Sequence, residues 1–310
     1  MTRPFLQRGI ALVMVLWFAT LLAVIASSFV FSTRTDTQLA QNAVALARAQ
    51  AAADAGVQRA IFELFLPAGN REAWKADGAP HQWEFGEAKL VVTLLDESAK
   101  IDLNTAGEPL LLGLFKGAGL NGNEAAALLD AVLDWRDSDD LRRPNGAEAP
   151  EYKASGLKIR PSNAPFETID ELRRVLGMRP EVYSHLESVL TVHSRLGDIY
   201  SAIAPRQVLL ALPGAQEEQV DAYLARRKAA LDANLPPPPF PSLAGSGASA
   251  SGSVFSVRAE AVLPDGTTFI RDAVVKWNPG IARKVIYLSW KEGVRLPVAG
   301  TGVNSTPSRK

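Results

Sequence analysis

The chain has 310 residues with 33 basic and 33 acidic side chains, so its formal net charge is zero. The chain therefore has no excess of basic residues of the kind that marks a nucleic-acid-binding protein. Its length fits one large domain or two smaller ones. There is no cysteine, which excludes disulfides and thiolate metal sites, and the three histidines (His81, His185 and His193) do not have helical ligand spacing.

The N-terminus carries a long apolar run behind a short basic leader. The leader has two charges, Arg3 and Arg8, and no charge follows until Arg34. As a helix, residues 10–31 would span about 33 Å, enough to cross a hydrocarbon core of about 30 Å. The positive leader predicts a cytoplasmic N-terminus, with everything after residue 32 across the membrane.

Three interpretations of this run compete: a secretory signal cleaved near Ala26, a simple membrane anchor, and a pilin-like leader cleaved between Gly9 and Ile10. The apolar run continues past Ala26, which weakens the first interpretation. Helix-forming residues then continue without a break to the stop at Pro67, which predicts a helix over 10–66, about 85 Å long. Its outer half is amphipathic. A single helix whose first half spans the membrane and whose second half packs on a globular domain is typical of pilins, so this pattern favours the pilin-like interpretation.

The segments RGIALVMVLWFATLLAVIASSFV and ARAQAAADAGVQRAIFEL resemble the minor pseudopilin K family of type II secretion systems. The resemblance covers nearly the whole chain. It implies that a prepilin peptidase cuts after Gly9 and that the new terminus, Ile10, is N-methylated. It further implies a single-pass bacterial inner-membrane protein with a periplasmic head, a structural subunit at the pseudopilus tip that supports export of folded proteins. The implied partners are other pseudopilins, with the I and J types forming the tip complex.

Position 14 departs from the general pilin pattern. Most pilins have glutamate at the fifth mature position, whereas this chain has Met14, as is typical of the K family. An unpaired charge at mid-membrane costs about 2.5–3.5 kcal/mol even on the lenient insertion scale. A subunit without that carboxylate needs no neighbour above it, so Met14 is the expected tip-capping position.

Beyond the first helix, residues 67–82 are expected to be a loop, followed by a strand at 89–96. Three further strands are predicted at 253–263, 267–278 and 284–293, the first two joined by a turn at 264–266. We infer an α+β fold in which one antiparallel sheet packs on the outer half of the long helix. The expected parts are a leader (1–9), a pilin helix (10–66), the first part of the α/β domain (67–97), an inserted helical domain (98–235), a Pro/Gly/Ser-rich linker (236–253), the remaining strands (254–296) and a disordered tail (297–310).

The insertion contains a weak repeat of helix, glycine turn and helix that resembles SAM-like and helix-hairpin-helix units. This raises an alternative, a membrane-anchored DNA-binding protein of a competence-like system. The turn Gly117-Ala118-Gly119 has the spacing with which such hairpins hold a phosphate. The second turn lacks its second glycine, and carboxylates crowd both turns. We therefore expect packing hairpins and no nucleic-acid partner.

The densest charge lies in DWRDSDDLRRPNGAEAPEY, residues 134–152. Calcium prefers six to eight oxygens, yet this is not an EF-hand, because Leu141 stands where a further ligand is needed. From the residues alone, a solvated acidic loop and a calcium site are both possible. The run resembles the pseudopilin K segment associated with calcium, although Ala149 stands where relatives often have Asp. That resemblance implies a structural Ca²⁺ held by Asp137, Asp139, Asp140, Glu148 and Glu151.

The sequence contains no motif of a hydrolase, nucleotide-binding protein or zinc enzyme. A Gly-x-Ser-x-Gly elbow, a P-loop and a zinc motif are all absent. The GSGASASGS run at 245–253 follows PPPPFP and is typical of a flexible linker rather than a nucleotide loop. We therefore expect a structural protein rather than an enzyme.

Overall fold

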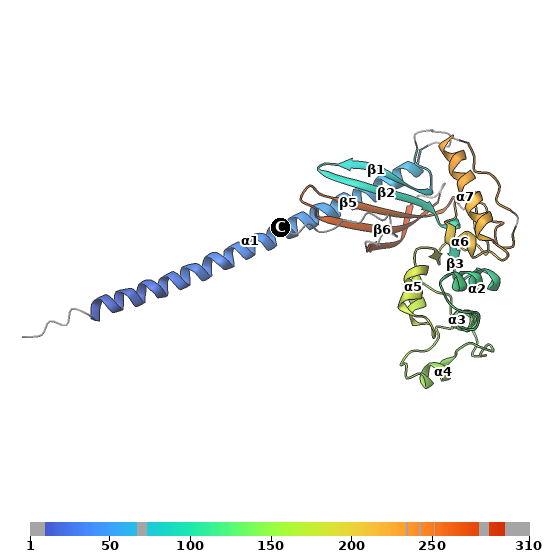
Figure 1. Cartoon of the computed structure of the whole chain (residues 1–310), viewed down its shortest axis with the longest axis horizontal. Helices are drawn as coiled ribbons and strands as arrows, with labels where there is room; N and C mark the ends of the chain where they lie inside the picture. Colours follow the sequence, from blue (N-terminus) through green and yellow to red (C-terminus); the bar gives the residue numbers. More distant parts are fainter. Residues whose placement is uncertain are drawn as a thin grey trace, which may run out of the picture.

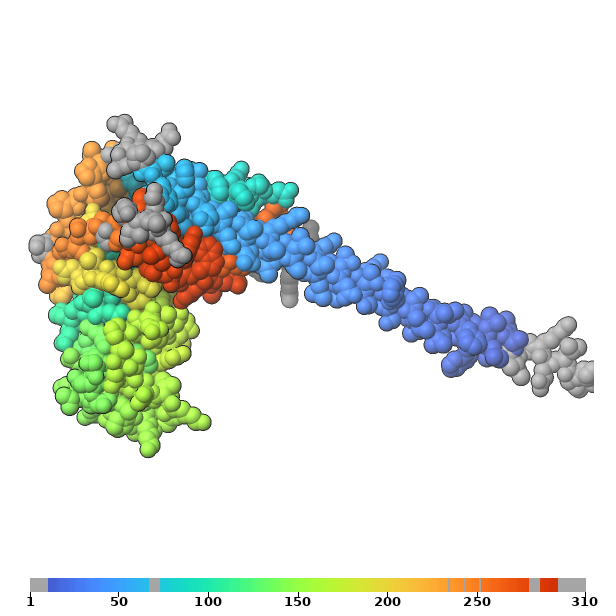
Figure 2. Space-filling model, turned by 180° about the vertical axis from the view of Figure 1, so that it is seen from behind, coloured from blue at the N-terminus to red at the C-terminus, as the bar shows by residue number. Residues whose placement is uncertain are grey.

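A long helix carries a compact head at one end in the computed structural model of the chain (Figure 1). The structure describes residues 10–66, 73–233, 235–241, 243–250, 252–278 and 285–294. The predicted leader and the predicted tail lie outside these residues. The head has two parts, a five-stranded sheet that packs on the helix and a helical insertion that extends to one side of the helix (Figures 1 and 2).

Helix α1 (Ile10–Leu64) is continuous over 55 residues and ends two residues before the predicted boundary. Its first half is exposed along its length, whereas its last turns bury small side chains against the sheet. Gly56 lies at the closest approach, since a Cβ there would meet Leu90 Cδ2 at 2.8 Å and Ala259 Cβ at 2.9 Å. Small residues at this position let the helix backbone approach the strands. The buried residues of this face are Ala49, Ala52, Ala53, Val57, Ala60 and Ile61.

The sheet has the order β1-β2-β5-β6-β7, and every neighbouring pair is antiparallel. The strands are β1 (Asp77–Phe85), β2 (Ala88–Asp96), β5 (Val254–Val262), β6 (Thr268–Trp277) and β7 (Val285–Glu292). The predicted turn between β5 and β6 is present, with Gly266 at φ +86°. Alternating side chains of the central strands pack on α1, so the predicted sheet and its place on the helix are confirmed.

The expected loop over 67–82 is wrong from residue 77 onward. Asp77–Phe85 forms the edge strand β1, paired with β2 from Phe85↔Ala88 to Asp77↔Leu95. The strand contains Gly78 and Pro80, which sequence patterns associate with turns. Its side chains are mostly exposed or half-buried, so no alternation of apolar residues marks it.

The helical insertion enters after β2 and returns before β5. Its α-helices are α2 (Glu108–Gly117), α3 (Gly122–Arg136), α4 (Ala149–Ala154), α5 (Pro180–Leu186), α6 (Arg206–Leu210) and α7 (Glu217–Asp232). Short 3-10 helices, η1 (Glu97–Ala99) and η2 (Ile169–Arg174), and a parallel pair of two-residue strands, β3 (Ile101–Asp102) and β4 (Leu190–Thr191), complete it. The insertion has a hydrophobic core separate from that of the sheet.

The two predicted helical hairpins pack on each other. Gly113 on α2 lies against α6 so closely that a Cβ would meet the Ala211 carbonyl oxygen at 2.1 Å. The predicted cap at Thr168 is present, because the Glu171 carboxylate accepts the Thr168 N–H at 3.0 Å. The helix that follows this cap is the 3-10 helix η2 rather than an α-helix.

Candidate functional site

The first candidate site is the exposed half of α1. Ile10 is the first residue of the helix, and Gly9 lies outside the described residues. Among the helices that the structure describes, α1 alone is long and apolar enough to cross a membrane, and its most apolar window is not buried by the head. Met14 lies within this apolar stretch with its side chain 55% exposed. The helix therefore presents an uncharged apolar surface below the head.

Between the apolar stretch and the sheet, α1 has a second exposed apolar surface. Leu39, Val44 and Leu46 are 61%, 52% and 48% exposed, because the sheet covers the helix only from Ala49 onward. Fully burying a side chain of this type stabilises an assembly by roughly 1.5–3 kcal/mol, and each of these half-exposed side chains would contribute part of that. These three residues are thus available to a neighbouring helix.

The second candidate site is the acidic loop after α3. Asp134, in the last turn of α3, is fully buried, and its carboxylate accepts the Arg143 N–H at 3.3 Å (Oδ1) and 3.2 Å (Oδ2). Gly146 lies directly on this carboxylate, since a Cβ there would be 2.0 Å from Asp134 Oδ2. Burial raises the pKa of Asp134, opposed by the Arg143 N–H. The loop folds back because glycine at 146 leaves room for that carboxylate.

Glu148 faces the same group of carboxylates. Its side chain is 3% exposed, and neither carboxylate oxygen has a hydrogen-bond donor within the described ranges. Burial raises the pKa of Glu148 to about 7, with further contributions from Asp134, Asp137, Asp140 and Asp139. A buried carboxylate without donors is costly unless a cation or a proton neutralises it.

The remaining predicted ligands are partly engaged. Asp137 keeps one buried oxygen, Oδ1, without a donor in the described part of the chain, whereas Asp139 Oδ1 accepts the Leu141 N–H at 2.8 Å. Asp140 Oδ1 accepts the Asn163 side-chain amide at 2.9 Å. Glu151 Oε2 accepts the Glu148 N–H at 3.0 Å, and its Oε1 pairs with Arg142. Glu151 thus caps α4 and pairs with Arg142.

The oxygen ligands of this cluster suit a hard cation such as Ca²⁺, because three buried carboxylate oxygens, those of Glu148 and Asp137 Oδ1, have no hydrogen-bond donor among the described residues. However, the described side chains do not form a complete metal-binding arrangement. Across the described residues, no three His, Asp or Glu side chains are arranged to hold one metal ion. Asp134, absent from the expected ligands, is the most deeply buried member. Its place at the end of α3, three residues before Asp137, is the sequence signal that was missed.

In the first helical hairpin, backbone N–H groups at the start of α3 donate to side chains of the hairpin itself. The Asn121 side chain accepts the N–H groups of Asn123 and Glu124 at 3.1 and 3.0 Å, and the Glu124 carboxylate accepts the Asn121 N–H at 3.1 Å. This capping box occupies the end of α3 at which a phosphate would bind. The hairpin packs the insertion together, as the sequence predicts.

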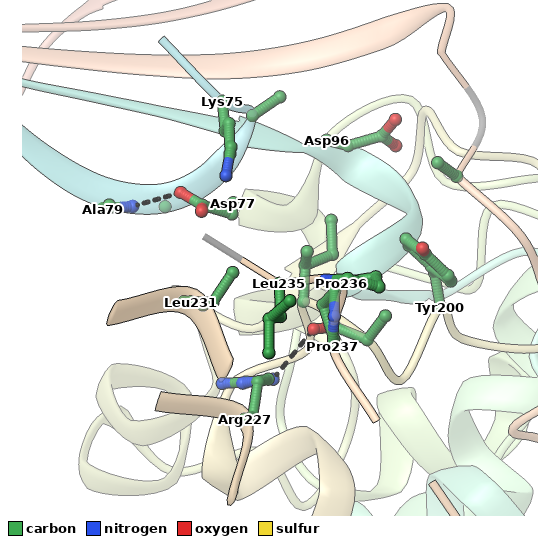
Figure 3. Close-up of a pocket in the computed structure, with 15 residues that line it drawn as sticks. Lys75, Asp77, Ala79, Asp96, Tyr200, Arg227, Leu231, Leu235, Pro236 and Pro237 are labelled. Atoms are coloured by element: carbon green, nitrogen blue, oxygen red, sulfur yellow. Dashed lines mark hydrogen bonds between the residues drawn. The ribbon is translucent and has the colours of Figure 1, made fainter. Parts of the chain in front are cut away.

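A cavity of about 580 Å³ lies between the start of β1 and α7 (Figure 3). Two charged side chains that line the cavity form hydrogen bonds with nearby backbone groups. Arg227 donates to the carbonyls of Ala202 and Ala204 at 3.4 and 2.8 Å, and Asp96 accepts the N–H groups of Ser98 and Gly252 at 2.9 Å each. The Arg227 hydrogen bonds hold α7 against residues 202–204 within the insertion, and the Asp96 hydrogen bonds hold the two ends of the insertion near the end of β2.

Comparison with known proteins identifies the chain's relatives. Residues 90–195 match the family described as type II secretion system (T2SS), protein K. The resemblance to protein K is confirmed. A type II secretion system protein K from Klebsiella pneumoniae is 27% identical over 202 residues, which cover 58% of this chain and 61% of that protein. The protein K of Pectobacterium carotovorum subsp. carotovorum is 36% identical over 73 residues, 24% of this chain and 22% of that protein.

The fold is also that of a solved protein K. The crystal structure of the GspK-GspI-GspJ complex from the enterotoxigenic Escherichia coli type 2 secretion system matches with a TM-score of 0.53 and 18% identity. The match covers 84% of this chain and 99% of the solved chain. The predicted α+β fold with a long N-terminal helix is therefore confirmed. The protein K match at 90–195 includes the acidic loop and most of the helical insertion.

Proposed function

We propose that this chain is a minor pseudopilin, a structural subunit at the tip of the periplasmic pseudopilus of a type II secretion system. It would support the export of folded proteins across the outer membrane without catalysing a reaction itself. The observation that carries this proposal is the geometry of α1. One continuous helix presents an exposed apolar half and then packs its small-residue face under a protein K head.

The proposed location is the bacterial inner membrane, crossed once, with the head in the periplasm. The uncharged run at 10–31 is of membrane-spanning length, and the positive leader sets the orientation. Prepilin peptidase would cleave after Gly9, and Ile10 would become the N-methylated terminus. Because Met14 supplies no carboxylate, it would require no subunit above it, which fits a cap.

The proposed partners are minor pseudopilins of the I and J types, together with other pseudopilins below them. Support comes from the solved protein with this fold, which was crystallised as a GspK-GspI-GspJ complex. The exposed side chains of Leu39, Val44 and Leu46 provide a surface for packing between neighbouring N-terminal helices. Such packing would bury apolar area that the chain's own sheet leaves uncovered.

We also propose that the carboxylate cluster holds a structural Ca²⁺. Glu148, Asp137 and Asp134 would supply the central oxygens, while Asp139 and Asp140 would complete the shell. The ion would neutralise the buried charges and fix residues 137–148 against α3. The support is the buried Glu148 carboxylate, whose oxygens lack donors in the part of the chain that is described.

Intact-mass measurement of the chain purified from membranes tests the proposed function most directly. A pseudopilin predicts a mature protein that begins at Ile10 and carries one additional methyl group. Cleavage near Ala26 would indicate a periplasmic soluble domain instead. An uncut chain would indicate a simple membrane-anchored protein, and either result would contradict the proposal.

A further inference from the structure

A hollow of about 660 Å³ lies at the end of the helical insertion, where α4 is farthest from the sheet (Figure 1). Residues from the end of α3, from α4 and the segment after it, and from η2 line this hollow. We call it the basic hollow, and its lining residues are Trp135, Lys153, Leu157, Lys158, Ile159, Arg160, Pro161, Ser162, Glu171 and Arg174.

Four cations border the basic hollow without carboxylate partners. Lys153, Lys158, Arg160 and Arg174 are exposed, and none forms an ion pair with any described residue. Several other exposed arginines of the insertion do form ion pairs, such as Arg142 with Glu151 and Arg206 with Asp221. The unpaired cations therefore give the hollow a positive potential that attracts anionic groups.

Glu171 is the one carboxylate among the described lining residues, and it offsets only part of this positive charge. Glu171 Oε1 already accepts the N–H groups of Glu167 and Thr168 at 2.9 and 3.0 Å. Four cations thus face one carboxylate that is engaged in capping η2. A single small anion would leave most of these cations unpaired, whereas a ligand with several carboxylates would match their spread.

Part of the wall of the hollow is apolar and follows a hydrogen-bonded turn. Leu157 and Ile159 are 41% and 40% exposed beside the ring of Trp135. They follow a Schellman motif at the end of α4, in which the Gly156 N–H donates to the Lys153 carbonyl and the Leu157 N–H to the Tyr152 carbonyl, each at 3.0 Å. Gly156 takes the left-handed conformation at φ +75°. This preformed turn reduces the ordering that a ligand must impose.

We propose that the basic hollow binds an acidic peptide segment of a partner protein, with an apolar side chain of that segment seated between Leu157 and Ile159. Concavity favours an inserted chain over a flat anionic bilayer. The interleaving of cations and aliphatic side chains favours a segment that alternates carboxylates with apolar residues. Neither the membrane half of α1 nor the acidic cluster is needed for this recognition.

The test measures binding of a fluorescein-labelled peptide of Glu-Glu-Leu repeats to the full chain in neutral detergent, by fluorescence anisotropy. The comparison peptide has Gln in place of every Glu. We expect the acidic peptide to bind at least about tenfold more tightly, and the difference to shrink as salt increases. The variant K158E/R160E should lose about tenfold or more in affinity. The control K116E/R226E reverses the same charges at exposed positions elsewhere on the insertion and should stay within about twofold.

A second variant separates the apolar contribution. L157S/I159S keeps every charge and should weaken the Glu-Glu-Leu peptide several-fold but leave a Glu-Glu-Ser peptide unchanged. Four outcomes would overturn the proposal: equal affinity for the Glu and Gln peptides, equal losses in K158E/R160E and the control, equal effects of L157S/I159S on both acidic peptides, or binding only to vesicles of anionic lipid. Because the substituted cations are exposed, melting temperatures should change little and loss of fold will not imitate loss of binding.

Discussion

Arg271 on β6 donates from Nε to Asp54 Oδ1 on α1 at 2.6 Å, and this pair joins the rod to the sheet. The Arg271 side chain is only 8% exposed, and its guanidinium lies 4.9 Å from the ring centroid of Phe269 and 5.1 Å from that of Trp290. A nearly buried cation between two rings has few ways to regain hydration. Asp54 is therefore the partner that makes this burial tolerable.

We expect Asp54→Ala to lower the free energy of unfolding of the head by about 2 kcal/mol, because it leaves the Arg271 charge buried without a carboxylate. Thermal melting of the full chain in detergent measures this. The matched control is Asp232→Ala, which removes the exposed partner of Lys228 on α7 and should cost less than about 0.5 kcal/mol. Equal losses in the two variants would mean that the Arg271–Asp54 pair contributes no more than a surface ion pair.

Gly56 tests the packing of the same helix on the sheet. A side chain at 56 would overlap Leu90 on β2 and Ala259 on β5, so Gly56→Val should destabilise the head by about 1–3 kcal/mol through overpacking. Gly122 in the first turn of α3 has no atom within 4 Å of an added Cβ. Gly122→Ala should therefore leave the melting temperature unchanged or raise it slightly. A Gly56→Val protein as stable as the parent would mean that the helix can move off the sheet at no cost.

For the cluster around Glu148, the predicted effect of a substitution on the melting temperature depends on whether Ca²⁺ is present. In the presence of a chelator, Glu148→Gln should raise the melting temperature at pH 7.5, because it removes a buried charge for which the described residues supply no hydrogen-bond donor. With Ca²⁺ added, the parent chain should become more stable and the variant should not respond. Glu218→Gln, on the exposed face of α7, serves as the control and should keep the full Ca²⁺ response. A parent chain whose melting temperature ignores Ca²⁺ would remove the metal proposal.

The same residue predicts how stability without metal depends on pH. The folded chain holds the pKa of Glu148 at about 7, above its ordinary value of 4.5, so between these pH values the folded state binds more protons than the unfolded state. The contribution of Glu148 to stability is therefore fully present below about pH 4.5 and is lost as pH rises through about 7. Melting curves in chelator across this range, for the parent and Glu148→Gln, isolate it. The difference between the two proteins should grow toward pH 7, and a constant difference would contradict the assignment.

The elements that the sequence predicts correctly are those whose pattern is local. Helix α1 is an unbroken run of helix formers, and β5 alternates apolar and polar residues from Phe255 to Ala261. Strand β1 was missed because its structure depends on pairing with β2 rather than on its own apolar pattern. Asp134 was missed as a central carboxylate for a similar reason. Its place three residues before Asp137 puts it in the acidic run, but its burial arises only when residues 143–147 fold back onto α3, a contact that the local sequence pattern does not show.

Met14 offers the sharpest test of the proposed place of the chain in the fibre. Met14→Glu would introduce a carboxylate on the exposed apolar surface of α1, where an unpaired charge costs about 2.5–3.5 kcal/mol. A neighbour's terminal amine above it could relieve that cost, so the variant should favour positions below the tip and lose recovery of the proposed I- and J-type partners. Co-purification from membranes and secretion of a reporter protein measure both effects, with Met14→Leu as the uncharged control. Unchanged partner recovery and secretion in Met14→Glu would show that the missing carboxylate does not define the cap.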